Sequence, residues 1–185
     1  MNTIDIIKIA CDFTGNEEIS VKLDERSSLT ESEQKVVDAL VKCLNLVQNE
    51  VATEYIPLEA IEEVKAVDLK VPYSAFSKKP IAVIFAKDSF GRNLRFRTFS
   101  DYLMVYAPRA KVKYHYMPDE ITSVEGELAQ PLLPMRIYAY GVAREYFLLQ
   151  TLGDDADIWE VRFKDSLSIF ARKKQEVRLP CRRWL

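Results

Sequence analysis

A single histidine, His115, is the first candidate for chemistry, because an imidazole titrates near neutral pH. It falls on the polar side of a predicted strand, where it alternates with apolar side chains alongside Lys111 and Lys113. Catalysis by one histidine needs an orienting acid or a nucleophile within reach, and the neighbouring sequence supplies no recognisable set. The pattern therefore predicts a surface strand residue rather than a general base.

Two pairs of adjacent acids, Glu62-Glu63 and Asp154-Asp155, are the next candidates, because carboxylates bind divalent cations. The first pair is expected at a strand edge and the second at the start of a helix. Acids at such positions are typically solvated, or they match the positive end of the helix dipole. We expect this ordinary role for both pairs.

Three cysteines, Cys11, Cys43 and Cys181, lie far apart in the sequence. Their odd number argues against a disulfide framework, and their spacing fits no metal site. Cys11 and Cys43 have apolar neighbours and are expected to act as small core residues. The sequence also lacks a glycine-rich phosphate cradle. It therefore predicts no enzyme, no metal and no cofactor.

Arg136, Tyr140 and Arg144 recur at every fourth position of a largely apolar predicted helix. Two interpretations stay open for the arginines. They form contacts with acids of a neighbouring subunit, or they pair inside the same helical bundle, with Glu145, Asp38 or Glu50 as the candidate acids.

The last residues form a basic and aromatic segment. Residues 171–185 contain six basic side chains and one acid, whereas the other 170 residues contain 20 basic and 27 acidic ones. Pro180 ends the preceding helix, and the apolar surface of Trp184-Leu185 gains from burial. Three interpretations stay open: an arm that folds back on its own subunit, insertion into a neighbouring protein, or contact with nucleic-acid phosphates.

Helices are expected at the start of the chain. Thr3 is expected to cap a first helix through about residue 13, which Gly15 ends. Thr30-Glu31-Ser32-Glu33 has the pattern of a capping box, and apolar residues then repeat at steps of three and four. This long helix is expected to run for some twenty-five residues and to close before Pro57.

From Leu58 to Met117 the pattern changes to β-rich runs separated by turns. The turn at residues 88–93 links two alternating runs, and we expect five or six antiparallel strands, enough to bury a face of their own. The expected strands cover residues 61–64, 67–71, 81–86, 94–99, 102–106 and 111–116.

Two helices are expected in residues 131–175, joined by a one-residue hinge at Gly153. The first, residues 132–149, is apolar around most of its circumference and needs cover on several sides, including from the long N-terminal helix. The second, from Asp154 to about Gln175, is amphipathic, with acids at its positive end and bases at its negative end. Its expected buried residues are Ala156, Trp159, Phe163, Leu167 and Phe170, and its terminal bases are Arg172, Lys173 and Lys174.

The elements together predict an α+β fold: a helical bundle from the N- and C-terminal segments, an inserted antiparallel β-sheet or sandwich region, and an extended C-terminal arm. No apolar run approaches the length that spans a bilayer, so no membrane partner is expected. The expected organisation is N-terminal helices at 1–57, a β-rich insertion at 58–118, C-terminal helices at 119–176 and the arm at 177–185.

This order of segments resembles the head–tail connector (adaptor) proteins of tailed bacteriophages, which sit beneath the portal ring. The resemblance spans nearly the whole chain and rests on packing and turn patterns. The segments that carry it are Asn45–Leu58 at the end of the long helix, Tyr114–Glu120 after the last strand, Tyr140–Tyr146, Ile158–Lys164 and the closing Arg182–Leu185.

The resemblance implies a structural protein of the virion neck that is assembled in the host cytoplasm. It implies a homo-oligomeric ring, commonly twelve-fold, which binds the portal and a neighbouring tail or stopper protein and only passes DNA through its lumen. The C-terminal arm would then dock on the portal. The residues expected in this arm are Arg178, Arg182, Arg183, Trp184 and Leu185, and possible inter-subunit contacts are Arg136, Arg144, Arg172, Lys173 and Lys174.

Two other classes of function are weighed against this one. A nucleic-acid-binding protein would use the basic arm together with Arg92, Arg95 and Arg97 of the β-region. A small hydrolase would need a perturbed acid or a nucleophile, and the sequence offers none.

Overall fold

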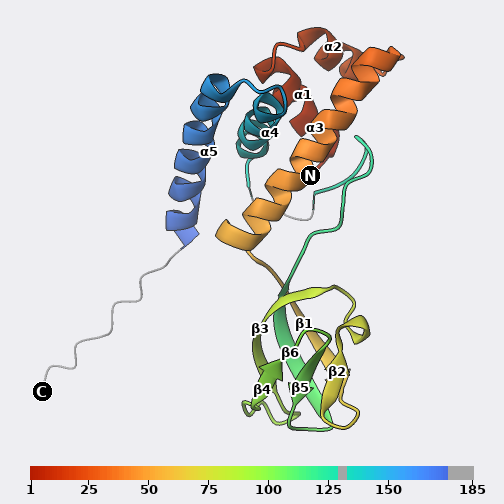
Figure 1. Cartoon of the computed structure of the whole chain (residues 1–185), viewed down its shortest axis with the longest axis vertical. Coiled ribbons are helices and arrows are strands. Elements are labelled where there is room, and N and C mark those ends of the chain that lie inside the picture. The colour runs from red at the N-terminus through yellow and green to blue at the C-terminus, as the bar shows by residue number, and fades with distance from the viewer. Residues whose placement is uncertain (129–132, 175–185) are drawn as a thin grey trace, which may run out of the picture. The chain divides into compact units, whose positions relative to one another are not determined.

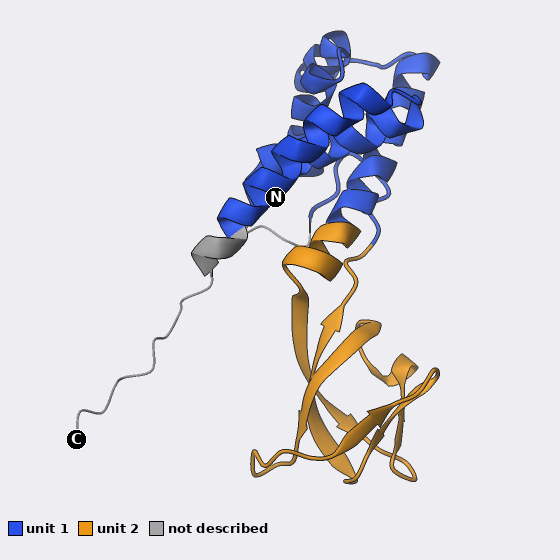
Figure 2. Cartoon of the chain, turned by 60° about the vertical axis from the view of Figure 1, so that its left-hand side comes forward, with its two compact units in different colours: residues 1–48, 120–185 blue, residues 49–119 orange. Residues whose placement is uncertain are grey.

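The computed structural model of the chain describes residues 1–128 and 133–174 (Figure 1). The chain divides into two compact units, of which unit 1 comprises residues 1–48 and 120–185 and unit 2 comprises residues 49–119 (Figure 2). Unit 1 is helical and unit 2 contains two antiparallel sheets, so the fold is α+β as predicted. The predicted β-rich insertion at 58–118 lies within unit 2.

The helices of unit 1 surround α4, which Figure 1 shows between α3 and α5. Gly141 of α4 is a point of close approach, because an added Cβ would lie 2.7 Å from Val47 of α3 and 3.0 Å from Phe163 of α5. The predicted packing of the apolar helix on the long helix is therefore confirmed. The helices are α1 (Thr3–Phe13), α2 (Glu17–Glu25), α3 (Glu31–Glu50), α4 (Met135–Leu149) and α5 (Gly153–Lys174).

The capping box at the start of α3 is confirmed. The Thr30 N–H donates to the Glu33 carboxylate at 2.8 Å, and the Glu33 N–H lies 3.4 Å from the Thr30 hydroxyl that accepts its hydrogen bond. After α3 the chain continues as a π-helical turn, η1 (Val51–Tyr55), in which the Ile56 N–H donates to the Val51 carbonyl at 2.7 Å. The helical segment thus closes before Pro57, as the sequence predicted.

The predicted cap of α1 is wrong. Thr3 is the first residue of the helix, and Asn2 precedes it without a side-chain cap. The start is fixed instead by backbone pairing with a distant segment: the Thr3 N–H donates to Gly126 at 3.0 Å and the Leu128 N–H donates to Met1 at 3.0 Å. Such long-range pairing leaves no signal in the local sequence.

The predicted one-residue hinge at Gly153 is also wrong, because Gly153 is the first residue of α5. The left-handed residue of the connection is Thr151, with a φ of 60°. The Leu152 N–H donates to the Phe147 carbonyl at 3.0 Å and so closes the end of α4. A β-branched residue in this conformation is uncommon, which is why the glycine was the more obvious choice.

Unit 2 contains two three-stranded antiparallel sheets, ordered β1-β6-β3 and β2-β5-β4; Figure 1 labels the strands. The predicted strand at 67–71 is only in part correct, because Asp68 and Leu69 have positive φ and form a turn before β2. The strands are β1 (Leu58–Lys65), β2 (Lys70–Pro72), β3 (Pro80–Lys87), β4 (Phe96–Thr98), β5 (Tyr102–Val105) and β6 (Arg109–Tyr116), with a 3-10 turn, η2 (Tyr73–Ala75), after β2.

The core of unit 2 takes side chains from both sheets. Val112 and Tyr114 on β6 and Leu103 and Val105 on β5 are fully buried in one apolar cluster. Lys111, Lys113 and His115 alternate with the buried residues of β6, so they belong to the other side of the strand. Unit 2 therefore has a core of its own.

Candidate interaction surfaces

His115 is part of a charged network on the outer side of the first sheet. Its Nε2 lies 3.5 Å from Glu59 on the neighbouring β1, and the Lys113 ammonium lies 2.7 Å from the same carboxylate. The hydrogen bond from Lys113 is the main cause of a lowered pKa of Glu59, and His115 adds to it. This is the cross-strand ion pairing that alternating charges produce, and it matches the strand position predicted for the histidine.

Glu62 is not the solvated acid that the sequence predicted. Its carboxylate accepts hydrogen bonds from the Ser77 N–H at 3.0 Å and from the hydroxyls of Ser77 and Tyr114. Burial opposes ionisation of Glu62, but these hydrogen bonds outweigh it and lower its pKa. Glu63, by contrast, is exposed. Glu62 thus links β1 to β6 and to the segment after η2, which is a structural role.

The two described cysteines are core residues, as predicted. Cys11 and Cys43 are fully buried free thiols, and burial raises the pKa of each to about 12. Thiols with such a pKa are not nucleophiles at neutral pH. Within residues 1–128 and 133–174, no group of three or more histidine, cysteine, aspartate or glutamate side chains could hold a metal ion. None of the helices in these ranges has the length and apolar character needed to cross a membrane.

Arg144 is paired inside unit 1, so pairing within the bundle is confirmed for this arginine. Its guanidinium is almost fully buried and donates to Glu145 at 2.5 Å and to Glu160 of α5 at 2.7 Å. Glu145 was among the predicted partners, whereas Glu160 was not. Arg136 is exposed and lies 5.5 Å from the centre of the Tyr140 ring. Of these two arginines, only Arg136 presents its charge at the surface.

An aromatic cluster that the sequence did not reveal joins α1, α4 and α5. It consists of Phe13, Tyr140 and Trp159, with the Phe13 ring 4.6 Å from Trp159 and 5.4 Å from Tyr140. The Arg162 guanidinium lies 4.9 Å from the centre of the Trp159 ring. Stacked rings and cation–π contacts of this kind fix the positions of the arginines that flank them.

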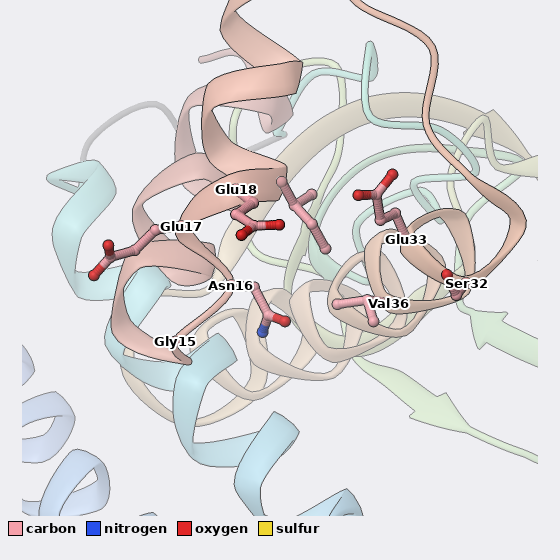
Figure 3. Close-up of a pocket in the computed structure, with 8 residues that line it drawn as sticks. Gly15, Asn16, Glu17, Glu18, Ser32, Glu33 and Val36 are labelled. Atoms are coloured by element: carbon pink, nitrogen blue, oxygen red, sulfur yellow. The ribbon is translucent and has the colours of Figure 1, made fainter.

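A pocket of about 520 Å³ opens between the turn that precedes α2 and the first turn of α3 (Figure 3). Glu17, Glu18 and Glu33 contribute carboxylates to its lining. Hydrogen bonds from Lys22 and Thr30 hold the pKa of Glu33 at about 2. Glu33 already caps α3 and forms an ion pair with Lys22. Its position in the pocket therefore has a sufficient structural explanation.

The outer side of α5 carries large apolar side chains opposite its buried side. Ala156, Phe163 and Leu167 face the core of unit 1 and are buried. Ile158, Val161 and Ile169, which we call the outer stripe, are 54%, 60% and 58% exposed. Further exposed leucines lie where α4 meets α5, at Leu148, Leu149 and Leu152. The amphipathic pattern used for the prediction identified only the buried side.

The turn before β4 displays an aromatic side chain. Phe90 is 82% exposed, and the Asp88 carboxylate fixes the turn by accepting hydrogen bonds from the Phe90 and Arg92 N–H groups, both at 2.9 Å. Arg92 pairs with Asp88 at 2.8 Å. Arg95 and Arg97 are exposed and have no ion pair within the described part of the chain. The turn and the residues that follow it thus expose one aromatic side chain and two arginines on unit 2.

The predicted docking arm lies outside the described residues, which applies to Arg178, Arg182, Arg183, Trp184 and Leu185. The same holds for the side chains of Arg172, Lys173 and Lys174. Candidate surfaces among the described residues include the outer stripe, the pocket lined by Glu17, Glu18 and Glu33, and the turn at Phe90 on unit 2. No protein-family model matches the chain, and no curated protein matches its sequence.

Proposed function

We propose that the chain is a head–tail adaptor, a structural virion protein that forms a ring beneath the portal and joins the DNA-filled head to the tail. The observation that supports it most is α5, a helix with apolar residues on two opposite sides whose end leads into the basic arm. A monomer gains nothing from the outer set of apolar residues, because water stays in contact with it. Such a helix fits a protein that works in contact with other subunits.

The distribution of charge is consistent with a DNA conduit. Residues 1–48 and 120–174 contain 18 acidic and 12 basic side chains, whereas residues 49–119 contain 9 acidic and 11 basic ones. Without residues 175–185, the helical unit is therefore acidic, and an acidic wall repels the phosphates of a passing duplex instead of binding them. The basic arm at residues 177–185 suits an acidic surface of the portal.

Electron microscopy of the chain mixed with purified portal rings tests the ring itself. We expect a second ring, commonly of twelve subunits, on one face of the portal particles. The chain alone and the portal alone provide the references. If the mixture shows only undecorated portal rings at micromolar excess of the chain, the adaptor proposal is wrong.

Deletion of residues 177–185 tests the arm separately. We expect the shortened chain to fold but to lose binding to portal particles in co-sedimentation. A full-length variant with Arg178, Arg182 and Arg183 changed to glutamine separates charge from length, and a Trp184→Ala variant tests the apolar contact. If the deletion variant binds portal particles as well as the original chain does, the arm is not the docking element. The proposal of a ring would not be affected.

One observation favours a second candidate, a nucleic-acid-binding protein: Arg95 and Arg97 are exposed and follow the exposed Phe90 by five and seven residues on unit 2. Arginines and an aromatic ring are the usual contacts for a single strand. Binding of labelled DNA over a range of salt concentrations discriminates the two functions, since log K falls with log salt by roughly 0.7–0.9 per neutralised phosphate. A steep dependence that disappears in an Arg95→Gln/Arg97→Gln variant would favour the second candidate over the adaptor.

A further inference from the structure

The outer stripe is a continuous feature of α5. Ile158, Val161, Asp165 and Ile169 follow one another at steps of three, four and four, so they lie along one side of the helix. Ile158, Val161 and Asp165 lie opposite Phe163, which is buried. Ile169 lies at the edge of this side, where it also lines a pocket with Arg136 and Tyr140 of α4. Single exposed apolar side chains are ordinary on a protein surface. Three on one side of a helix, each more than half exposed and interrupted only by Asp165, form a side that a second helix can cover.

Two charged residues lie on this side of α5. Arg162 and Asp165 are exposed, and neither forms an ion pair with any described residue. Arg162 is held against the Trp159 ring, 4.9 Å from its centre, so its direction is fixed before any partner arrives. Both charges therefore remain available to a second molecule.

The positions of these residues are symmetric along the helix. Ile158 and Ile169 lie at equal distances in sequence from the point between Phe163 and Lys164, and so do Arg162 and Asp165. A second α5 that runs antiparallel about this point sets Ile158 opposite Ile169. It also sets each Arg162 opposite an Asp165. A surface that is complementary to itself in this way forms a two-fold, closed contact.

We propose that a second copy of this chain binds the outer stripe. The two α5 helices then run antiparallel, and a two-fold axis relates them at the level of residues 163 and 164 along the helix. The inference uses the same side of α5 as the adaptor proposal but does not require a ring. A ring needs a head-to-tail contact between two different surfaces, whereas this contact closes on itself. The pair is therefore a state of the free chain, and α5 has to separate from its partner wherever a ring uses the same face.

The contact is expected to be weak, because one pair of helices buries less than the roughly 1,200–2,000 Å² of stable interfaces. Sedimentation velocity of the full chain without portal, from micromolar to near-millimolar concentration, measures it. We expect a reversible monomer–dimer equilibrium. A chain that is monomeric over this range, or that forms a trimer or larger assembly, overturns the inference.

Charge exchange between the two positions is the decisive experiment. Arg162→Asp sets two carboxylates opposite each other, Asp165→Arg sets two guanidinium groups opposite each other, and each is expected to raise the dimer Kd about tenfold or more. The double variant R162D/D165R restores the opposite charges and is expected to return the Kd to within about threefold of the original. If the double variant is as weak as the single ones, the antiparallel contact is wrong.

An apolar variant and a matched control test the rest of the contact. Ile158→Asp is expected to weaken the dimer at least tenfold, because it sets a carboxylate against the apolar Ile169. Val21→Asp changes an equally exposed apolar residue, 55% exposed, on α2 and is expected to leave the Kd unchanged. Equal effects of the two variants would show that the contact does not involve α5. If the chain is monomeric in solution but forms rings on portal particles, the two-fold dimer is wrong and the adaptor proposal is not affected.

Discussion

Replacing Gly141 with alanine tests how closely the helices of unit 1 pack. A Cβ at this position would lie 2.7 and 2.9 Å from the two γ-carbons of Val47 and 3.0 Å from Cε2 of Phe163. Both neighbouring side chains are fully buried. Valine in a helix has one strongly preferred χ1 rotamer, so Val47 has no alternative position to move to. The new methyl group therefore forces α3, α4 and α5 apart.

The expected cost follows from two opposing effects. Overpacking a close-packed core costs about 1–3 kcal/mol. Alanine in place of glycine inside a helix returns up to roughly 1 kcal/mol. We expect Gly141→Ala to lower the free energy of unfolding by about 1–2 kcal/mol. Gly141→Val, with a branched side chain, is expected to cost more than about 3 kcal/mol.

Thermal unfolding followed by far-UV circular dichroism measures the effect, because most of that signal comes from the helices of unit 1. A loss of about 1 kcal/mol corresponds to a fall in Tm of roughly 3–6 °C for a unit of this size. Gly153→Ala is the matched control, since nothing lies within 4 Å of an added Cβ there. We expect that variant to be as stable as the original chain or slightly more so. If Gly141→Ala melts at or above the original temperature, the packing argument is wrong.

Three further predictions concern polar groups. The pKa of Glu33 is lowered from 4.5 to about 2, so the Glu33 carboxylate stabilises the folded state fully above about pH 4.5, and this stabilisation disappears as the pH falls toward 2. Glu33→Gln should remove this part of the loss of stability in acid, which denaturant titrations at a series of pH values would measure. Arg144→Ala leaves two carboxylates without their buried partner and should cost about 2–3 kcal/mol in urea unfolding, whereas Arg136→Ala, which changes an exposed residue, should cost less than about 0.5 kcal/mol. Tyr114→Phe removes a hydrogen bond to the Glu62 carboxylate and should destabilise unit 2 by about 1–2 kcal/mol. Near-UV circular dichroism or amide hydrogen exchange of β6 would detect this loss. Amide exchange at the original rate would show that this hydrogen bond adds no stability.

The elements that the sequence predicts correctly are those with local causes. The capping box at Thr30 and Glu33 involves residues three apart, and the apolar period of α3 repeats within single turns. The alternation along β6 likewise follows from the geometry of one strand. Each of these signals can be recognised in a window of a few residues, without knowledge of the rest of the fold.

The predictions that fail depend on contacts between distant segments. Thr3 is not a cap because residues 126–128 pair with the start of the chain. Glu62 is not solvated because Ser77 and Tyr114 approach it from other elements. A single sequence gives no information on which distant residues will meet, so these arrangements could not be predicted.

The candidate surfaces show the same division. Cys11 and Cys43 were correctly predicted as core residues from their apolar neighbours. The outer stripe was missed because a helix with apolar residues on both sides gives a weaker amphipathic signal than one with a single apolar side, and only the buried side was identified. The aromatic cluster was missed because Phe13, Tyr140 and Trp159 come from three different helices.

The insertion of unit 2 also determines the order in which the chain can fold during synthesis. Unit 2 is continuous in sequence, and pairing of Leu58 with Tyr116 brings its entry and exit strands side by side. It can fold on the ribosome before α4 has been made, and the loop that α3 and α4 must close is then short. Until α4 emerges, the apolar face of α3 lacks its cover. The helical unit is therefore the part of the nascent chain that completes its core last.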